Sequence, residues 1–354
     1  MSQFRVIDSG IRGARANIAF DQALIDAHRA GQIPNTIRFL RFERSVLVGR
    51  HQLVSSEIHR DYCLENNIEI ARRITGGGAI YFDRGQLGWE LVFSRNTFGS
   101  KDLSKIAETI CGAAALGLRK LGVDARFRPR NDIEVGGRKL CGTGGFFDGD
   151  SVFYQGTLLI ESDPEEVVRA LNVPKAKLEK RDLDRAAQRL VTLKELLPAP
   201  IPGIGEIQTA LLKGFEEQLG ITLSYADPSS TEEEQATQNL ADEIGADTFV
   251  YELDNSITAT PTYTGTVSVP GGTVSAHVRL EGAHSNRLRE VMFSGDFFIS
   301  PPRILFDLEA ALRGVSVIEL ASVLGRFFDN ASIETLSLES GTFQAALEEA
   351  LHDV

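Results

Sequence analysis

The chain has 354 residues, of which 42% are hydrophobic and 24% are charged, and a formal net charge of −12. These values are close to the averages of globular proteins and exclude a disordered chain, a collagen-like repeat and a coiled coil. The sequence has no run of about 18 apolar residues and no secretory signal pattern, so we expect a cytoplasmic protein. The length predicts about two domains.

The charge is divided unevenly along the chain. Residues 225–354 contain 21 acidic residues, six arginines and no lysine, whereas residues 1–224 contain 28 acidic and 31 basic residues. Such a difference indicates two domains of different character. A net acidic chain is poorly suited to bind nucleic acid, because phosphate contacts need a basic face. We therefore predict no nucleic-acid partner.

The first 223 residues alternate between helical and strand-like patterns. Apolar residues recur at helical spacing over residues 16–30 and 103–121, and a glycine ends each run. Residues 36–49 and 152–160 are rich in β-branched and aromatic residues, which is typical of strands. This alternation predicts a mixed α/β, or α+β, fold. Residues 165–171 and 204–219 are further helical candidates.

A change of composition separates the two predicted domains. Residues 227–238, DPSSTEEEQATQ, combine proline, serine and three glutamates, and we expect an acidic linker there. The prediction places a catalytic domain at residues 1–226 and a second domain at residues 239–354. The second domain is expected to be a small α+β unit with at least one hairpin and with helices at 316–328 and 342–351.

Cysteine and histidine give no pattern of a metal site. The three cysteines, Cys63, Cys111 and Cys141, include no CxxC pair, and the six histidines are scattered. This arrangement predicts neither a disulfide framework nor a zinc site. Cys63 and Cys111 lie in apolar helical segments, so we expect both to be packing residues.

Two arginines, Arg72 and Arg73, come shortly before three consecutive glycines, Gly76–Gly78. Glycine loses more backbone entropy on folding than other residues, so such a run indicates that another group approaches the main chain closely. Bare N–H groups can bind an anion, and arginines add positive charge. The alternative is a glycine-rich hairpin with two solvated arginines. The GK[ST] of a P-loop and the GxGxxG of a dinucleotide site are both missing.

A second polar group consists of Asn131-Asp132 and Arg138-Lys139. The glycine pair at residues 136–137 separates two extended runs and predicts a tight hairpin, since both positions reach positive φ at no cost. The hairpin brings Lys139 close to Asp132 and to the glycine-rich residues 142–145. The alternative is a surface lysine in an ion pair that contributes about 0–1 kcal/mol.

In this order and spacing, the segments RRITGGGAIYFD, RNDIEVGGRKLCGTGG and FYQGTLLI resemble the lipoate–protein ligase family. The resemblance covers residues 15–223, and the acidic second domain resembles the accessory domain of that family. It implies a mixed-sheet catalytic domain of the biotin/lipoate-ligase type with a small C-terminal α+β accessory domain fused to it.

The resemblance also implies an activity. Family members use ATP, with Mg²⁺, to convert lipoate or octanoate to an acyl-AMP, and then transfer the acyl group to a lysine of a lipoyl-acceptor protein. The acceptor would be an H-protein or the lipoyl domain of a 2-oxoacid dehydrogenase, and the enzyme would be a monomer that binds no membrane. Basic residues Arg126, Arg128 and Arg130 are expected to face an acidic acceptor.

The family's motif assigns roles to single residues of this chain. Lys139 would be the catalytic cation that bridges the carboxylate and the α-phosphate, and Asp132 would help to hold Mg²⁺. Arg73 would contact lipoate or its adenylate. The residues implied to bind the acid or ATP are Arg73, Thr75, Gly76, Gly77, Gly78, Ala79, Ile80, Tyr81, Asn131, Asp132, Lys139 and Gly142.

The chain departs from the family pattern at a few positions. Phe82 and Gln155 stand where the family usually has histidine, which puts the acyl selectivity in question. Cys141 stands where serine is common. Octanoyltransferases, a related class, use a cysteine thiolate as acyl nucleophile and need no ATP, so Cys141 raises that alternative. In their closest branch the nucleophile lies near the Asn-Asp position, and we therefore expect Cys141 to be a small residue in a tight turn.

Two further alternatives receive less support. A non-catalytic paralogue that only binds acyl domains would not need Lys139 and the glycine run. A biotin-attaching enzyme would carry a GRGRRG-type loop, which is not present in this sequence. The sequence therefore predicts a ligase, and lipoate is the leading acid.

Overall fold

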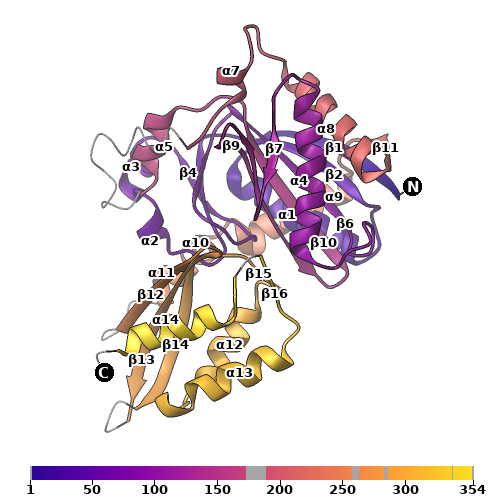
Figure 1. Cartoon of the computed structure of the whole chain (residues 1–354). Helices are drawn as coiled ribbons and strands as arrows, with labels where there is room; N and C mark the ends of the chain where they lie inside the picture. Colours follow the sequence, from indigo (N-terminus) through magenta and orange to yellow (C-terminus); the bar gives the residue numbers. More distant parts are fainter. Residues whose placement is uncertain (1, 173–188, 257–262, 283–285, 337, 353–354) are drawn as a thin grey trace.

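The computed structural model describes residues 2–172, 189–256, 263–282, 286–336 and 338–352. Figure 1 shows two units, a larger one above and a smaller one, in orange and yellow, below it. Both contain helices and sheets, which confirms the predicted α+β class. Among the described residues, no helix has the length and apolar character needed to span a bilayer.

A mixed sheet of eight strands forms the framework of the larger unit. The strands are β1 (Ser2–Arg12), β2 (Thr36–Phe42), β6 (Gln86–Ser94), β7 (Arg126–Arg128), β8 (Asp132–Val135), β9 (Arg138–Asp148), β10 (Ser151–Leu159) and β11 (Ile221–Tyr225). They lie in the order β11-β1-β2-β6-β10-β9-β8-β7. Strand β1 pairs in parallel with β11 and β2, and the other neighbours are antiparallel.

A second sheet of the larger unit carries the glycine run. Its strands are β3 (Ser45–Val48), β4 (Glu69–Arg72) and β5 (Ile80–Phe82), in the order β4-β3-β5. Because β4 and β5 lie on opposite sides of β3, residues 73–79 must cross the end of this sheet to connect them. The glycines therefore lie in a loop at a sheet edge, where polar sites are commonly built.

Helices cover both faces of the large sheet (Figure 1). Helices α4 (Leu103–Arg119) and α8 (Ile204–Leu219) pack on one face, and α1 (Ala14–Arg29) packs on the other. These three helices confirm the predictions at residues 103–121, 204–219 and 16–30. Shorter helices complete the unit, namely α2 (Val54–Glu57), α3 (Arg60–Glu65), α5 (Pro164–Ala170) and α7 (Leu193–Leu196).

The smaller unit has its own apolar core. An antiparallel sheet of β12 (Tyr263–Val269), β13 (Gly272–Glu281) and β14 (Arg287–Asp296) packs against helices on one face. The helices are α12 (Ile304–Leu312), α13 (Leu320–Asn330), which follows the 3-10 turn η3 (Val317–Glu319), and α14 (Gly341–Leu351). Strands β15 (Ile299–Ser300) and β16 (Glu334–Thr335) form a short ladder beside the larger unit.

The acidic segment that was expected to be a linker forms most of helix α9 (Ser230–Asn239). Its glutamates make ion pairs with the first strand, Glu232 with Arg5 and Glu233 with Arg12. The chain continues through η2 (Leu240–Ile244), α10 (Asp247–Val250) and α11 (Glu252–Ser256). These ion pairs hold the segment, as a helix, against the larger unit, and its role as a linker stays a prediction. The division into two domains at this segment stays a prediction.

Two glycines allow helices α4 and α8 to approach closely. A Cβ atom added at Gly214 would lie 2.3 Å from the Ala113 carbonyl oxygen, and one added at Gly117 would lie 2.5 Å from the Ala210 carbonyl oxygen. Both distances are shorter than any normal contact, and both involve backbone atoms that cannot rotate away. Glycine at these positions therefore sets the spacing of the two helices.

We expect Gly214→Ala to lower the free energy of unfolding by about 1–3 kcal/mol, because the methyl group forces the two helices apart. The measurement is the urea midpoint. Gly205→Ala in the same helix is the matched control. Its added Cβ meets no atom within 4 Å, so alanine's helix propensity should raise stability by up to about 1 kcal/mol. Equal destabilisation by both changes would contradict the close approach.

Candidate functional site

Arg73 determines the shape of the glycine loop. Its side chain is buried, and its guanidinium donates hydrogen bonds to the carbonyl oxygens of Leu47, Gly76 and Gly78 at 2.9, 3.1 and 2.8 Å. Burial lowers its pKa to about 10, which leaves it charged at neutral pH. Arg72 is also buried and donates to backbone carbonyls, including that of Val250 in α10. The alternative of two solvated arginines is therefore wrong.

Lys139 lies where the predicted hairpin places it. Gly136 and Gly137, both at positive φ, connect β8 to β9. The Lys139 Nζ atom is 2.8 Å from Asp132 Oδ1, and Arg128 pairs with the other oxygen of that carboxylate. Burial opposes ionisation of Asp132, but the two cations lower the pKa of its carboxyl group below the usual value.

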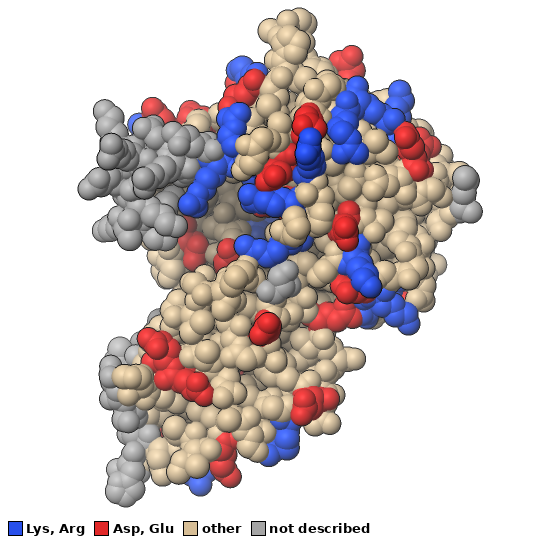
Figure 2. Space-filling view, viewed as in Figure 1, with Lys and Arg blue, Asp and Glu red and all other residues tan. Residues whose placement is uncertain are grey.

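The Lys139 side chain and the glycine loop open into one cavity of about 290 Å³. Figure 2 shows Lys and Arg side chains gathered around a hollow on the larger unit, whereas the smaller unit exposes more Asp and Glu. The predicted site residues that line the cavity are Arg73, Gly76, Gly77, Gly78, Ala79, Ile80, Asn131, Asp132, Lys139 and Gly142. A Cβ atom at Gly142 would lie 2.6 Å from Lys139 Nζ, so this glycine leaves room for the ammonium group.

Two predicted site residues do not line this cavity. Thr75 is buried, and its hydroxyl accepts a hydrogen bond from Gln155 Nε2 at 2.9 Å, which fastens the glycine loop to β10. The Tyr81 hydroxyl points instead toward Arg44 and Glu166. Thr75 and Tyr81 therefore lie outside the cavity lining, and their contact with the acid or ATP stays a prediction. Both roles were implied by the resemblance to the family, which does not specify the direction in which each side chain points.

A narrow apolar extension leads from this cavity into the larger unit. It has about 20 Å³ of free space and shares Arg73, Ile80, Gln155 and Thr157 with the main cavity. Phe82 stacks on Phe42 with ring centroids 4.3 Å apart. The remaining wall is made by Ile18, Leu40, Phe42, Leu47, Phe82, Gly88, Trp89, Glu90 and Gly156.

The smaller unit supplies part of the main cavity. The Gly77 amide donates to the Phe297 carbonyl oxygen at 3.0 Å, and the Phe298 ring lies where a Cβ atom of Gly77 or Gly144 would stand, at 2.7 and 2.4 Å. Another group thus approaches the main chain closely at the glycine run, as the sequence predicts. The partner in this structure is an aromatic ring of the same chain.

Asp296 brings a carboxylate into a cavity rich in cations. No hydrogen bond or ion pair within the described residues fixes it, and it lines the cavity together with Arg73, Lys139 and Arg130. Burial raises the pKa of its carboxyl group, and the three cations oppose this effect. Sequence reasoning missed Asp296 and Phe298, because neither belongs to a local motif and both lie far along the chain from Lys139.

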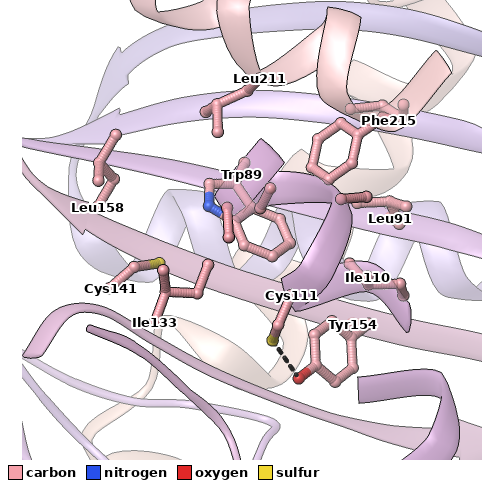
Figure 3. Packing of buried hydrophobic residues seen from close by; sticks show 14 of the residues in the cluster. Trp89, Leu91, Ile110, Cys111, Ile133, Cys141, Tyr154, Leu158, Leu211 and Phe215 are labelled. Carbon is pink, nitrogen blue, oxygen red and sulfur yellow. Dashed lines mark hydrogen bonds between the residues drawn. The ribbon is translucent and has the colours of Figure 1, made fainter. Parts of the chain in front are cut away.

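The cysteines are buried away from the cavity. Figure 3 shows Cys141 among apolar side chains such as Trp89 and Ile133, and Cys111 bonded to the Tyr154 hydroxyl at 3.4 Å. Burial raises the pKa of the Cys141 thiol, and it raises those of Cys111 and Cys63 to about 11. Cys141 lies within strand β9 rather than in the tight turn that was expected. Among the described residues, no thiol lines the main cavity.

No group of three or more His, Cys, Asp or Glu side chains in the described part of the chain is arranged to hold a metal ion. Asp132 is the predicted Mg²⁺ ligand, and both of its oxygens already face cations. Mg²⁺ commonly takes one or two protein carboxylates and completes its shell with phosphate oxygens and water. Asp132 as the one predicted protein ligand fits only that mode of binding.

Comparison with known proteins gives consistent matches. A model of the lipoyl protein ligase A/B catalytic domain matches residues 13–216. Lipoate-protein ligase A subunit 1 of Thermoplasma acidophilum is 29% identical over 232 residues, which cover 63% of this chain and 85% of that protein. Lipoate–protein ligase 1 of Staphylococcus aureus is 34% identical over 48% of this chain. The matched part of this chain spans about half the length of that protein. Octanoyltransferase LipM of Kyrpidia tusciae is 27% identical, covering 68% of this chain and 96% of that protein.

Solved structures give the same result for the fold. A bipartite lipoate protein ligase of Thermoplasma acidophilum, described with its E2 lipoyl domain, has a TM-score of 0.64 at 26% identity and covers 71% of this chain and 96% of that one. A lipoate-protein ligase A bound with ATP has a TM-score of 0.62 at 26% identity, covering 71% of this chain and 99% of that one. The match to P. falciparum LipL1 in complex with lipoate covers 99% of this chain and 100% of that one, with a TM-score of 0.74. Because the identity is 17%, this match shows similarity of fold alone.

The burial of the cysteines predicts that none of them reacts quickly in the native protein. At pH 8 we expect no thiol to reduce DTNB within minutes, and all three to do so in denaturant, because both burial and a raised pKa suppress the thiolate. The measurement is the absorbance of the released thionitrobenzoate. A rapidly reacting thiol that disappears in Cys141→Ala would show that the site can expose this sulfur.

Proposed function

Because the chain belongs to the lipoyl protein ligase A/B family through its catalytic domain, we propose that it is an ATP-dependent lipoate–protein ligase. It would convert lipoate, or octanoate, to an acyl-AMP and transfer the acyl group to a lysine of a lipoyl-acceptor domain. The observation that carries this proposal is the shared cavity of the Lys139 ammonium and the bare backbone at Gly76–Gly78.

The chemistry of adenylation explains why such a cavity is needed. A carboxylate and a triphosphate repel each other and must be brought within bonding distance. Lys139 is a compact charge that can contact both anions, and it stabilises the additional charge on the phosphorus in the transition state. Because Asp132 holds the ammonium group at 2.8 Å, the cation is positioned before the substrates bind.

The narrow extension is the proposed site of the acyl chain. Its aliphatic and aromatic walls suit a hydrocarbon chain, which gains about 0.8 kcal/mol for each buried methylene group. A volume of about 20 Å³ holds about one water molecule, so walls such as Phe82 or Leu40 must move when an eight-carbon chain enters. Phe82, which stands where the family usually has histidine, stacks on Phe42, so this part of the wall is apolar.

Asp132 is the proposed protein ligand of Mg²⁺, with Asn131 beside it at the cavity wall. The ion would neutralise phosphate charge. The protein's own contribution is to hold the Asp132 carboxylate between Lys139 and Arg128, in a fixed position toward the cavity. Ordered placement of these three side chains lowers the cost of reorganisation during the reaction.

The second candidate function is ATP-independent octanoyl transfer with Cys141 as nucleophile. Its support is the match to an octanoyltransferase along most of that protein's length. Against it stands the position of the sulfur, which lies in the apolar core with a raised thiol pKa rather than at the cavity. A nucleophilic cysteine needs the opposite environment, exposed and electropositive. We therefore favour the ligase.

The proposed acceptor is a lipoyl domain, such as an H-protein or the lipoyl domain of a 2-oxoacid dehydrogenase. Support comes from the archaeal relative, which is described with its E2 lipoyl domain. Three basic residues were expected to face the acceptor. Arg130 lines the cavity and Arg128 pairs with Asp132. Of the three, only Arg126 neither lines the cavity nor contacts Asp132. Cytoplasmic location and a monomeric state stay predictions from the sequence.

Pyrophosphate exchange into ATP tests the proposal. With lipoate or octanoate, we expect Lys139→Met to lower the exchange rate at least about 100-fold, because the cation between the two anions is lost. Lys194→Met, which removes an exposed lysine paired with Glu161, and Cys141→Ala are the matched controls and should keep the rate. If ATP is not exchanged but acyl carrier protein donates octanoate in a reaction that Cys141→Ala abolishes, the enzyme is the transferase.

Charge reversal at Arg126 tests the acceptor surface. Arg126 is exposed and pairs only with Asp124 among the described residues, so Arg126→Glu should leave adenylation unchanged. We expect transfer to an acidic lipoyl domain to slow severalfold at low salt, since electrostatic attraction accelerates encounter. Arg326→Glu on helix α13 is the control. An equal loss in both variants, or a loss confined to adenylation, contradicts the placement.

A further inference from the structure

Arg130 is the cation of the main cavity that the fold leaves without a partner. Among the described residues, the basic side chains that line this cavity are Arg73, Arg130 and Lys139. Arg73 is occupied by three backbone carbonyl oxygens, and Lys139 is paired with Asp132. The guanidinium of Arg130 forms no hydrogen bond or ion pair with any described residue. Its positive charge is therefore available to a ligand.

The charge of Arg130 acts on the cavity rather than on bulk solvent alone. Together with Arg73 and Lys139, it opposes the effect of burial on the pKa of the Asp296 carboxyl group. Asp296 lines the same cavity as the three cations. Exposed charges act on one another strongly only within about 10 Å, so the Arg130 guanidinium lies on the cavity side, near Asp296.

The backbone of Arg130 is strained. Its φ is 92°, and the other residue besides glycine with a positive φ in the described chain is Asn67, a residue type that tolerates this region. For an arginine such a conformation costs free energy that a glycine at the same position would avoid. Strained positions of this kind cluster at functional sites, which points to a role for the side chain of Arg130.

Strand β9 holds the strained turn in place. Residues 129–131 connect β7 to β8. Directly after Arg130, the Asn131 carbonyl oxygen accepts hydrogen bonds from the amide and the hydroxyl group of Thr143, both at 2.8 Å. The Asn131 side chain donates to the Thr143 carbonyl oxygen in return. These bonds fix the turn, so that Arg130 is presented to the cavity in spite of its backbone conformation.

We propose that Arg130 binds the pyrophosphate part of ATP and stabilises it as the leaving group of adenylation. This inference rests on the proposed function. In that step a carboxylate oxygen of the acid forms a bond to the α-phosphorus, and the bond from this phosphorus to the α,β-bridging oxygen breaks. The electron pair stays with the bridging oxygen, so negative charge increases on the departing pyrophosphate. A fixed cation at that place stabilises the transition state more than the bound ATP.

The chemistry of the leaving group suits an arginine without a partner. Lys139 is a compact charge that is assigned to the carboxylate and the α-phosphate, whereas the β- and γ-phosphates carry most of the negative charge of the triphosphate. A guanidinium presents several N–H donors in a planar fork that matches phosphate oxygens. Since Arg130 has no partner among the described residues, it gives up no ion pair with them when it binds these oxygens.

Removal of the Arg130 charge tests the assignment in pyrophosphate exchange with lipoate. We expect Arg130→Gln to lower kcat/KM for ATP about 10–100-fold and to raise the KM for pyrophosphate, because charge-assisted contacts to both are lost. Arg126→Gln, which removes an exposed arginine from the same hairpin, is the matched control and should keep both constants. Equal constants in the two variants would overturn the inference. Absence of exchange in the wild type with every acid would instead contradict the proposed function.

Transfer from chemically prepared lipoyl-AMP separates the leaving group from the acceptor. This half-reaction releases AMP and no pyrophosphate, so Arg130→Gln should leave its rate to a lipoyl domain unchanged. A loss of this transfer together with normal pyrophosphate exchange would overturn the inference and place Arg130 at the acceptor surface.

The variant Arg130→Gly separates the side chain from the backbone. Glycine adopts positive φ freely but carries no charge, so we expect a higher urea midpoint than in the wild type, together with the loss of exchange seen in Arg130→Gln. Stability and activity then change in opposite directions, which a merely structural role of the arginine would not produce. A urea midpoint below that of the wild type, or exchange at the wild-type rate, would overturn the inference.

Discussion

The site depends on one buried interaction, the guanidinium of Arg73 bound to three backbone carbonyls. A loop with three glycines has little side-chain packing to hold it, and its free energy of ordering must come from elsewhere. Arg73 supplies it by donating to Leu47, Gly76 and Gly78, so that the loop stands at the edge of the β3–β5 sheet with its backbone bare. Removing this cation would take a donor from all three carbonyls, and a carbonyl left buried and unpaired costs more than the bond itself contributes.

Once the loop is fixed, other groups can approach it closely. The Phe298 ring occupies the space beside Gly77 and Gly144, and the Gly77 amide donates to the smaller unit. Lys139 faces the same cavity from the β8–β9 hairpin, over Gly142. Glycine at residues 77, 142 and 144 therefore allows the close approaches by which the loop, strand β9 and the smaller unit enclose the cavity. An anionic substrate in the cavity would enter a field set by Lys139 and by the carboxylates of Asp132 and Asp296.

Local patterns predicted much of this arrangement, and their limits have physical causes. The Gly136–Gly137 hairpin and the long helices follow from turn chemistry and periodicity, which act over a few residues. Helix α9 begins with a capping box of Ser229 and Glu232, a local signal that the sequence contains but that composition alone does not show. Its ion pairs with Arg5 and Arg12, more than 200 residues away, could not be read from local patterns. The resemblance implies that Arg73 contacts the acid or its adenylate, which stays a prediction, but the sequence does not show which backbone carbonyls its guanidinium meets. Asp296 and Phe298 are brought to the site by tertiary packing alone.

The distribution of charge along the cavity has a consequence for what it can accept. Cations stand in the middle, at Lys139 and Arg73, with Asp296 toward the smaller unit and Glu90 in the interior. Asp296 lies in the field of several cations and is open to the cavity, so its charge is tolerated without a partner. Glu90 is fully buried, and its charge is tolerated only because Arg38 lies beside it. The complementary molecule is negative at its centre and meets a positive group near Asp296. Under the proposed function, an acyl-adenylate approached by the ammonium group of an acceptor lysine has this order of charges.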